Sequence, residues 1–180
     1  MKPFPGTIWA GTAALLLVIA AIVACGPRPP GVSLLEAIDQ EDVELVRAHM
    51  EFGTDPDEMF IPPEYPFAGA SALHLAVLKD NEEIVGILLE GGANIDIKAR
   101  EYFQGTPLDW AAFWGIKDMG VLLVEKGADV NSRTVVNSTP LDAAKADNPF
   151  IQVGQLEEFL ENREFIQDYL AANGGKLGVD

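Results

Sequence analysis

The 180-residue sequence has a single cysteine, two histidines and only 12 lysine and arginine residues. One cysteine excludes an internal disulfide framework and a zinc site built from several cysteines. The 28 acidic residues give a formal net charge of −16, which argues against nucleic-acid binding because that function requires a basic surface to displace counterions from phosphate. Hydrophobic residues make up 48% of the chain, too many for a disordered protein. The composition therefore predicts a folded acidic chain with no nucleic-acid partner.

Residues that carry chemistry are equally sparse. Neither His49 nor His74 has a second histidine, a cysteine or a carboxylate at the spacing of a metal site or a general base. No serine, cysteine or lysine stands beside a candidate base, so nucleophilic catalysis has no candidate residue. We therefore predict that the chain is not an enzyme and that it uses no metal, no cofactor and no small-molecule substrate.

The N-terminal segment is almost free of charge, because Lys2 is the only charged residue before Arg28. Its apolar run over residues 8–24 lies between the lengths typical of a signal-peptide core and of a membrane span. The run ends in Ile22-Val23-Ala24-Cys25-Gly26. This ending resembles the bacterial lipobox, which implies cleavage before Cys25 and attachment of lipid to that cysteine. The alternative is an uncleaved membrane helix in which the Cys25 thiol stays unmodified and has no function.

The lipobox resemblance sets the expected order of segments and the location. A signal peptide spans residues 1–24, and residues 25–31 form the lipidated cysteine and a proline-rich tether. Six residues of extended polyproline conformation reach about 19 Å, which holds the folded part close to the lipid. Gly26 stands where an aspartate, in enterobacterial lipoproteins, goes with retention in the inner membrane. The resemblance thus implies a bacterial envelope protein that faces the periplasm, in the outer membrane rather than the inner one.

The rest of the chain, residues 32–180, contains internal repeats. The segment Thr106-Pro107-Leu108-Asp109-Trp110-Ala111 has counterparts that begin at Ser71, 35 residues earlier, and at Thr139, 33 residues later. A second marker, Gly-Ala followed by Asn or Asp, occurs at 92–94 and again 35 residues later at 127–129. Because both markers keep the same spacing, they predict a periodic fold.

These two markers resemble the ankyrin repeat family, in which a TPLH-like start opens two antiparallel helices and a Gly-Ala-Asp-like exit leads into a finger loop. The resemblance implies an all-α solenoid of about four helix-turn-helix repeats with finger loops, preceded by the signal or anchor segment. The repeats are expected at about 32–66, 67–103, 104–136 and 137–178. In this family the residue at the fourth motif position, here His74, hydrogen-bonds within the fold, so we assign it a structural role.

Local signals agree with this arrangement. Thr106 and Thr139 suit helix N-caps that are followed by proline at the first helical position. Glycines that suit left-handed C-caps follow four apolar segments: Gly53, Gly92, Gly127 and Gly174. The finger after Gly53 is long and rich in proline and aromatic residues. About fourteen extra residues lie between Ala144 and Ile166, and we expect them to form an added helix that closes the C-terminal end.

The family resemblance places partner contacts at the finger tips and at the exposed end of each first helix. In this sequence the partner-binding positions are Phe67, Leu78, Lys79, Tyr102, Phe103, Phe113, Trp114, Val135, Val136 and Asp147. Most are aromatic or aliphatic, and exposed apolar patches commonly mark binding surfaces. Trp110 is interpreted as a packing residue. The alternative is that the long proline-rich loop folds back and covers Phe113 and Trp114.

The functional expectation is a membrane-tethered, non-catalytic protein-binding module. Its acidic charge favours a basic partner. The short tether, the acidity and the apolar positions together suggest an immunity-type inhibitor of a secreted toxin or enzyme. Two alternatives stay open: a periplasmic scaffold that supports an envelope or oxidative-stress enzyme, and a passive structural protein of the envelope.

Overall fold

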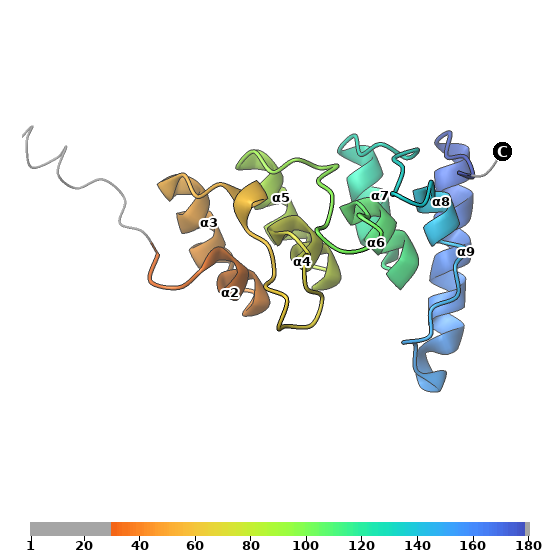
Figure 1. The fold of residues 1–180 in the computed structure, drawn as a ribbon, viewed down its shortest axis with the longest axis horizontal. Coiled ribbons are helices and arrows are strands. Elements are labelled where there is room, and N and C mark those ends of the chain that lie inside the picture. Colours follow the sequence, from red (N-terminus) through yellow and green to blue (C-terminus); the bar gives the residue numbers. More distant parts are fainter. Residues whose placement is uncertain (1–29, 179–180) are drawn as a thin grey trace, which may run out of the picture.

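The computed structural model describes residues 30–178, so the predicted signal peptide and Cys25 lie outside the described residues. Within this range eight α-helices follow one another along an elongated array (Figure 1). Their bounds are α2 Leu34–Asp39, α3 Val43–Phe52, α4 Ala72–Leu78, α5 Glu82–Glu90, α6 Pro107–Trp114, α7 Lys117–Glu125, α8 Pro140–Ala143 and α9 Leu156–Ala172. Two short 3-10 helices, η1 Pro56–Glu58 and η2 Val153–Gln155, lie in the connections.

The helices form pairs that stack in two layers, so that each layer runs along the array (Figure 1). In one layer α2 contacts α4, α4 contacts α6, and α6 contacts α8. In the other layer α3 contacts α5, and α7 contacts α9. A single isolated bridge between Phe60 and Ser71 is the extent of β-structure in residues 30–178. The prediction of an all-α solenoid is therefore confirmed. Among these described helices, none has both the length and the hydropathy that a bilayer span requires.

The first helices begin where the repeat motif predicts. Thr106 and Thr139 are N-caps whose side chains accept from the backbone N–H three residues on, and a proline follows each of them at the start of the helix. Ser71 caps α4 in the same way. In all three helices the side chain three residues after the cap accepts from the N–H of the capping residue, which completes a reciprocal capping box.

The glycines expected at helix ends adopt the left-handed conformation that favours glycine. Gly53 ends α3 with φ +88°, and Gly92 and Gly127 follow α5 and α7 with φ +98° and +95°. Gly174 follows α9 with φ +87°. Gly53, Gly92 and Gly127 turn the chain out of a second helix toward the next repeat, and Gly174 ends the last helix.

An apolar core runs continuously between the two layers. Its largest fully buried side chains include Leu34, Ile38, Leu73, Ile84, Leu88, Leu108, Met119, Leu123 and Leu170. A fully buried alanine stands at the same motif position of each repeat, in the first helix (Ala37, Ala76 and Ala111) or as the C-cap of α8 (Ala144). Because helix separation depends on the side chains at the contact, these small residues let successive first helices pack closely. Each repeat therefore buries its apolar face against the next one.

Side-chain hydrogen bonds also join neighbouring repeats. The Asp57 carboxylate accepts from the Asn94 N–H, with an N–O distance of 3.0 Å to Oδ1. Asp96 Oδ1 accepts from the Asp129 N–H at 2.9 Å, and Asn131 Oδ1 accepts from the Lys176 N–H at 2.8 Å. We call this set the inter-repeat hydrogen-bond row. It fixes the turn that follows each second helix to the corresponding turn of the next repeat.

The fourth helix pair differs from the expectation of a separate added helix. The extra residues instead extend the second helix, so that α9 runs unbroken for 17 residues. No proline or glycine interrupts its sequence, and its first half projects past the neighbouring helices (Figure 1). The partner helix α8 is only four residues long. The Arg163 guanidinium lies beyond its end and donates to the carbonyl oxygens of Ala144 and Ala146, which gives these carbonyls partners outside a helix.

Candidate partner-binding site

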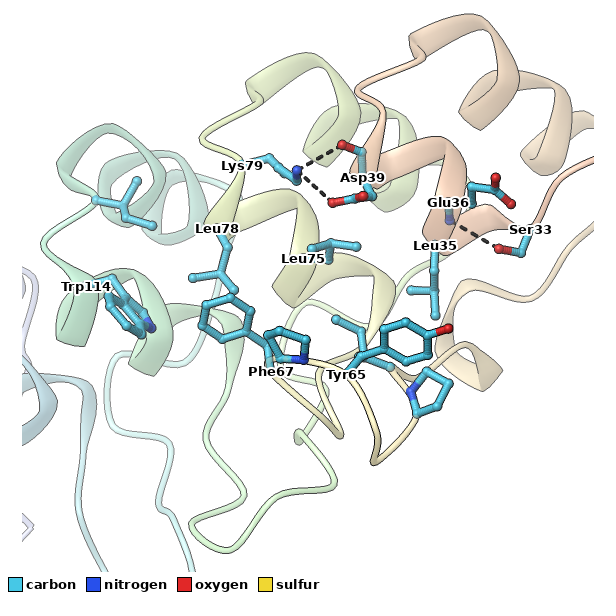
Figure 2. A pocket seen from close by; sticks show the side chains of 14 residues that line it. Ser33, Leu35, Glu36, Asp39, Tyr65, Phe67, Leu75, Leu78, Lys79 and Trp114 are labelled. Carbon is cyan, nitrogen blue, oxygen red and sulfur yellow. Dashed lines mark hydrogen bonds and ion pairs between the residues drawn. The ribbon is translucent and has the colours of Figure 1, made fainter. Parts of the chain in front are cut away.

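An open groove with a volume of about 1180 Å³ crosses the first three repeats. One side is formed by the helices α2, α4 and α6, and the other by the long proline-rich loop between α3 and α4 (Figure 2). Apolar and aromatic side chains dominate the lining, which includes Leu35, Ile61, Tyr65, Phe67, Leu75, Leu78, Trp114 and Ile116. We call this feature the loop groove.

The loop that forms one wall is held by backbone contacts. Its two arms are joined by the bonds from the Ile61 N–H to the Ala70 carbonyl and from the Gly69 N–H to the Ile61 carbonyl, each 2.8 Å. Gly69 also accepts from the Arg100 N–H of the next finger at 2.7 Å. A Cβ on Gly69 would lie 2.6 Å from the Arg100 carbonyl carbon, so this approach requires glycine. The loop wall is thus anchored to the following repeat.

Aromatic contacts close the α6 end of the loop groove. Phe67 packs edge-on against Trp114, with ring centroids 5.8 Å apart, and it also contacts Trp110 at 6.1 Å. Phe67 has a left-handed backbone, φ +60°, which is unfavourable for a bulky residue. Phe150, from the segment before α9, covers another part of Trp114 at 5.8 Å. This end therefore presents a preformed apolar surface.

A polar edge runs along the ends of α2 and α4. The Lys79 ammonium donates to a carboxylate oxygen of Asp39 at 2.8 Å and to the Asp39 backbone carbonyl at 2.9 Å (Figure 2). It thereby links the first repeat to the second. Glu36 is exposed on α2, where it accepts from the Gln40 amide at 3.3 Å. The loop groove therefore combines an apolar interior with a polar edge that has more carboxylates than cations.

The sequence-predicted partner residues fall into separate places. Four of them, Phe67, Leu78, Lys79 and Trp114, come together in the loop groove. The finger-tip residues form a second exposed apolar group made of Tyr102, Phe103, Val135 and Val136. Within this group the Tyr102 and Phe103 rings meet edge to face at 5.1 Å, and the Val135 N–H donates to the Phe103 carbonyl at 3.1 Å. Cys25 lies outside the described residues.

Three predicted positions differ in detail from the expectation. Phe113 and Trp114 are half-buried rather than open to solvent, because Phe67 of the long loop and Phe150 pack on Trp114 and the Trp114 ring packs on Phe113. The alternative, in which the loop folds back over Phe113 and Trp114, is therefore confirmed in part, because Phe67 of the loop packs on Trp114. Asp147 is exposed, but it lies in a loop and not on a first helix, since α8 ends at Ala143.

Sequence reasoning did not identify several lining residues, notably Tyr65 and Ile61 of the loop and Leu35, Glu36 and Leu75 of the helices. The proline and aromatic content of the loop was a visible signal, but it did not indicate which helices the loop faces. Leu35 and Leu75 lie on the same side of α2 and α4 as the expected positions but about one turn before them, so the family's positional rule did not include them.

The fourth motif position is a titratable residue in repeats two, three and four, where it is His74, Asp109 and Asp142. The pKa is lowered for His74 and Asp142 and raised for Asp109. His74 is fully buried, with Nδ1 close to the Ser71 hydroxyl and Nε2 3.1 Å from the Gly105 carbonyl of the next repeat. Burial lowers the pKa of His74 to about 4. The predicted structural role of His74 is thus confirmed. His49 is also buried, although less completely, with Nε2 3.0 Å from the Val32 carbonyl.

Asp109 occupies the same motif position in the third repeat. Its Oδ2 accepts from the Thr106 N–H at 2.7 Å and from the Thr106 hydroxyl at 2.9 Å. Across residues 30–178, its Oδ1 is the buried side-chain oxygen or nitrogen without a hydrogen-bond partner. Burial raises the pKa of Asp109 to about 6, against the lowering effect of the Thr106 bonds. This carboxyl is enclosed within the repeat stack and does not line the loop groove.

In the part of the chain that the structure describes, no three His, Cys, Asp or Glu side chains gather at the spacing of a metal site. Most of the predicted partner-binding residues instead contribute to two surface features, the loop groove and the finger-tip group. Both are surfaces for contact with another macromolecule, and an elongated helical repeat array with such surfaces is the architecture of a protein-interaction module.

Comparison with known families identifies the array. The profile of the ankyrin repeats, in three copies, matches residues 34–134, which is more than half of the chain. The chain belongs to the ankyrin repeat family. Ankyrin repeats are protein–protein interaction modules, which agrees with the exposed apolar groove.

Curated relatives match part of this chain. The BTB/POZ domain and ankyrin repeat-containing protein NBCL of Lupinus angustifolius is 41% identical over 108 residues, which are 59% of this chain and 20% of the lupin protein. Protein phosphatase 1 regulatory subunit 12A of Rattus norvegicus is 31% identical over 99 residues, 55% of this chain and 9% of the rat protein. The chain thus spans a fifth or less of the length of these relatives.

Proposed function

We propose that this chain is a non-catalytic binding module that holds a segment of a partner protein in the loop groove. The observation that carries the proposal is the groove itself, an apolar surface that three first helices and one anchored loop hold open. Ankyrin repeats serve protein interaction, and an exposed apolar surface that is rimmed by polar residues commonly marks a binding site. Both histidines are engaged in hydrogen bonds inside the fold, which supports a binding role over a catalytic one.

The second part of the proposal concerns location. Lipid on Cys25 holds the module at the bacterial envelope, facing the periplasm, and the tether of residues 25–31 keeps it near the membrane. The support comes from the sequence ending Ile22-Val23-Ala24-Cys25 after an apolar run. The net charge of −16 favours a basic partner. A short tether and an acidic binding module together fit an immunity-type inhibitor of a secreted toxin or enzyme.

Cross-linking in living cells tests the binding site. A photo-crosslinking amino acid replaces Tyr65, which lines the loop groove and is 60% exposed. The matched control places the same amino acid at Leu160, an exposed apolar residue of α9 that does not line the groove. We expect one partner to be captured from position 65 and not from position 160. Equal capture from both positions would contradict binding in the groove.

The identity of the captured partner decides between the two roles. A basic secreted toxin or enzyme, together with growth inhibition when this chain is deleted, supports neutralisation. A resident envelope or oxidative-stress enzyme supports the scaffold alternative. Lipidation is tested separately by incorporation of labelled palmitate into the full chain. We expect labelling to be lost in Cys25→Ala, and persistent labelling of that variant would show that Cys25 is not the lipid site.

A further inference from the structure

We propose that the loop groove binds an extended partner segment with a lysine or arginine at one end and a bulky apolar side chain at the other. The basic residue lies over Glu36 on α2, and the apolar residue lies at Trp114 on α6. This inference rests on the proposed function and adds the chemistry and orientation of the partner segment. It follows from the different character of the two ends of the groove.

The dimensions of the loop groove favour a short extended segment. The groove crosses α2, α4 and α6, which amounts to two helix spacings of about 8 to 10 Å each. An extended chain advances about 3.3 Å per residue, so about six residues cover this distance. The volume of about 1180 Å³ is above the range of about 300 to 1,000 Å³ that is usual for small-molecule sites. A peptide segment therefore fits the groove better than a small molecule does.

The α6 end selects an apolar side chain. The lining at this end comes from Phe67, Trp114 and Ile116, none of which carries a charge. Phe67 and Trp114 are already in edge-to-face contact at 5.8 Å, and Phe67 keeps a left-handed backbone in this position. A surface that is arranged before binding costs little ordering entropy when a ligand arrives. An aromatic or large aliphatic residue of the partner gains most from this end.

The α2 end selects a basic side chain. Lys79 is engaged with both a carboxylate oxygen and the backbone carbonyl of Asp39, so its charge is already compensated. Glu36, by contrast, accepts from the neutral Gln40 amide and takes part in none of the ion pairs of residues 30–178. Its exposed carboxylate is therefore the acceptor to which an incoming lysine or arginine can donate.

Charge also decides between possible occupants. A second copy of this chain brings the same net charge of −16, so the two copies repel each other as they approach. An anionic lipid surface is disfavoured for the same reason. A basic segment is attracted both by the overall charge and by Glu36, which makes it the occupant that the electrostatics favour.

The test begins with random peptides displayed on phage and selected against the immobilised full chain. We expect enriched peptides to share a lysine or arginine that is separated by about four to six residues from a large apolar side chain, as the span of the groove requires. Enrichment of peptides without a basic residue would overturn the inference, and so would the failure to enrich any peptide.

Affinity measurements on one enriched peptide then assign its two ends. Fluorescence anisotropy should show about 3- to 5-fold weaker binding to Glu36→Gln, the size of one exposed ion pair. Binding to Trp114→Ala should weaken at least about 30-fold, as for an interface hot spot. Tyr65→Ser should also weaken binding. Because Tyr65 is 60% exposed, this variant tests the groove with little risk to folding. The control Leu160→Ala should bind like the unchanged chain.

A charge exchange separates recognition from folding. A peptide with glutamate in place of its basic residue should bind the unchanged chain poorly, and Glu36→Lys should restore its binding. If the groove variants weaken binding but neither the Glu36 variants nor the exchange has an effect, the inference is wrong and the proposed function stands. If none of the groove variants weakens binding of the partner captured by cross-linking, the proposed function itself is wrong.

Discussion

Replacing Asp109 by asparagine is expected to change the pH dependence of stability in a direction that the structure fixes. The Asp109 carboxyl is buried, and one of its oxygens lacks a hydrogen-bond partner. Burial raises the pKa of this group from 3.8 to about 6. A carboxyl whose pKa rises on folding stabilises the folded state below pH 4, and this stabilisation is lost as the pH rises through 6.

The size of the effect follows from the shift. One pKa unit corresponds to about 1.4 kcal/mol, so a shift from 3.8 to about 6 makes the ionised carboxylate cost about 3 kcal/mol at neutral pH. About 2 kcal/mol of this cost develops between pH 4.5 and 7.5. Asparagine retains an oxygen that accepts from Thr106 but carries no charge. Its unpaired amide costs about 1 to 3 kcal/mol at every pH, so the pH dependence reports the charge more clearly than the absolute stability does.

Urea unfolding of the full chain and of Asp109→Asn, followed by circular dichroism at pH 4.5, 6 and 7.5, measures the difference. Relative to the unchanged chain, the variant should gain about 2 kcal/mol in free energy of unfolding from pH 4.5 to 7.5. His74 and the other titrating groups are shared by both chains and cancel in this comparison. A difference that stays constant with pH would refute the conclusion that Asp109 is buried with a raised pKa.

Asp142 is the matched control, because it occupies the same motif position in the fourth repeat. Burial raises its pKa, but this effect is outweighed by hydrogen bonds from the Thr139 N–H, the Gly178 N–H and the Thr139 hydroxyl, so the pKa is lowered overall. A carboxyl with a lowered pKa stabilises the fold above pH 4 and loses this effect as the pH falls. Asp142→Asn should therefore lower stability at pH 7.5, and its difference from the unchanged chain should shrink at acidic pH.

Two further substitutions test how the loop wall and the end helix are held. Gly69→Ala places a Cβ 2.6 Å from the Arg100 carbonyl in a residue with φ +84°. We expect it to lower the free energy of unfolding in urea by about 1 to 3 kcal/mol. The control Gly154→Ala, with open space around the new Cβ, should leave this free energy nearly unchanged. Arg163→Ala removes the donor to the Ala146 carbonyl, while Gln167 still reaches the Ala144 carbonyl, so a loss of about 1 to 3 kcal/mol is expected. Glu164→Ala on the exposed side of α9 should change stability by less than about 0.5 kcal/mol. An unaffected Arg163→Ala would show that the guanidinium is not needed to hold the fourth repeat.

Most of the fold could be predicted from the sequence because the repeat signals are local. The threonine and proline at 106–107 and 139–140 determine where helices begin, and Gly53 and its counterparts determine where they end. The single long α9 was not predicted. Its apolar spacing suits a helix, but spacing alone does not say whether two helical stretches are joined. The sequence between Leu156 and Ala172 contains no proline or glycine, and this absence indicates one continuous helix.

Less of the candidate site could be predicted. The positional rule of the family correctly brings Leu78, Lys79 and Trp114 to one surface. It contains no information about the opposite wall, which depends on contacts between residues far apart in the chain. Phe67 meets Trp114 only because the loop folds back over the helices, and the sequence of the loop does not specify this aromatic partner.

The inter-repeat hydrogen-bond row gives the array a direction from its first repeat to its last. In every pair the earlier repeat supplies the accepting side chain, Asp57, Asp96 or Asn131, and the later repeat supplies the backbone N–H. Shortening the protein from its two ends is therefore not equivalent. Removal of the first repeat takes the Asp57 carboxylate away from the exposed Asn94 N–H, whereas removal of the last repeat takes the Lys176 N–H away from the exposed Asn131 side chain.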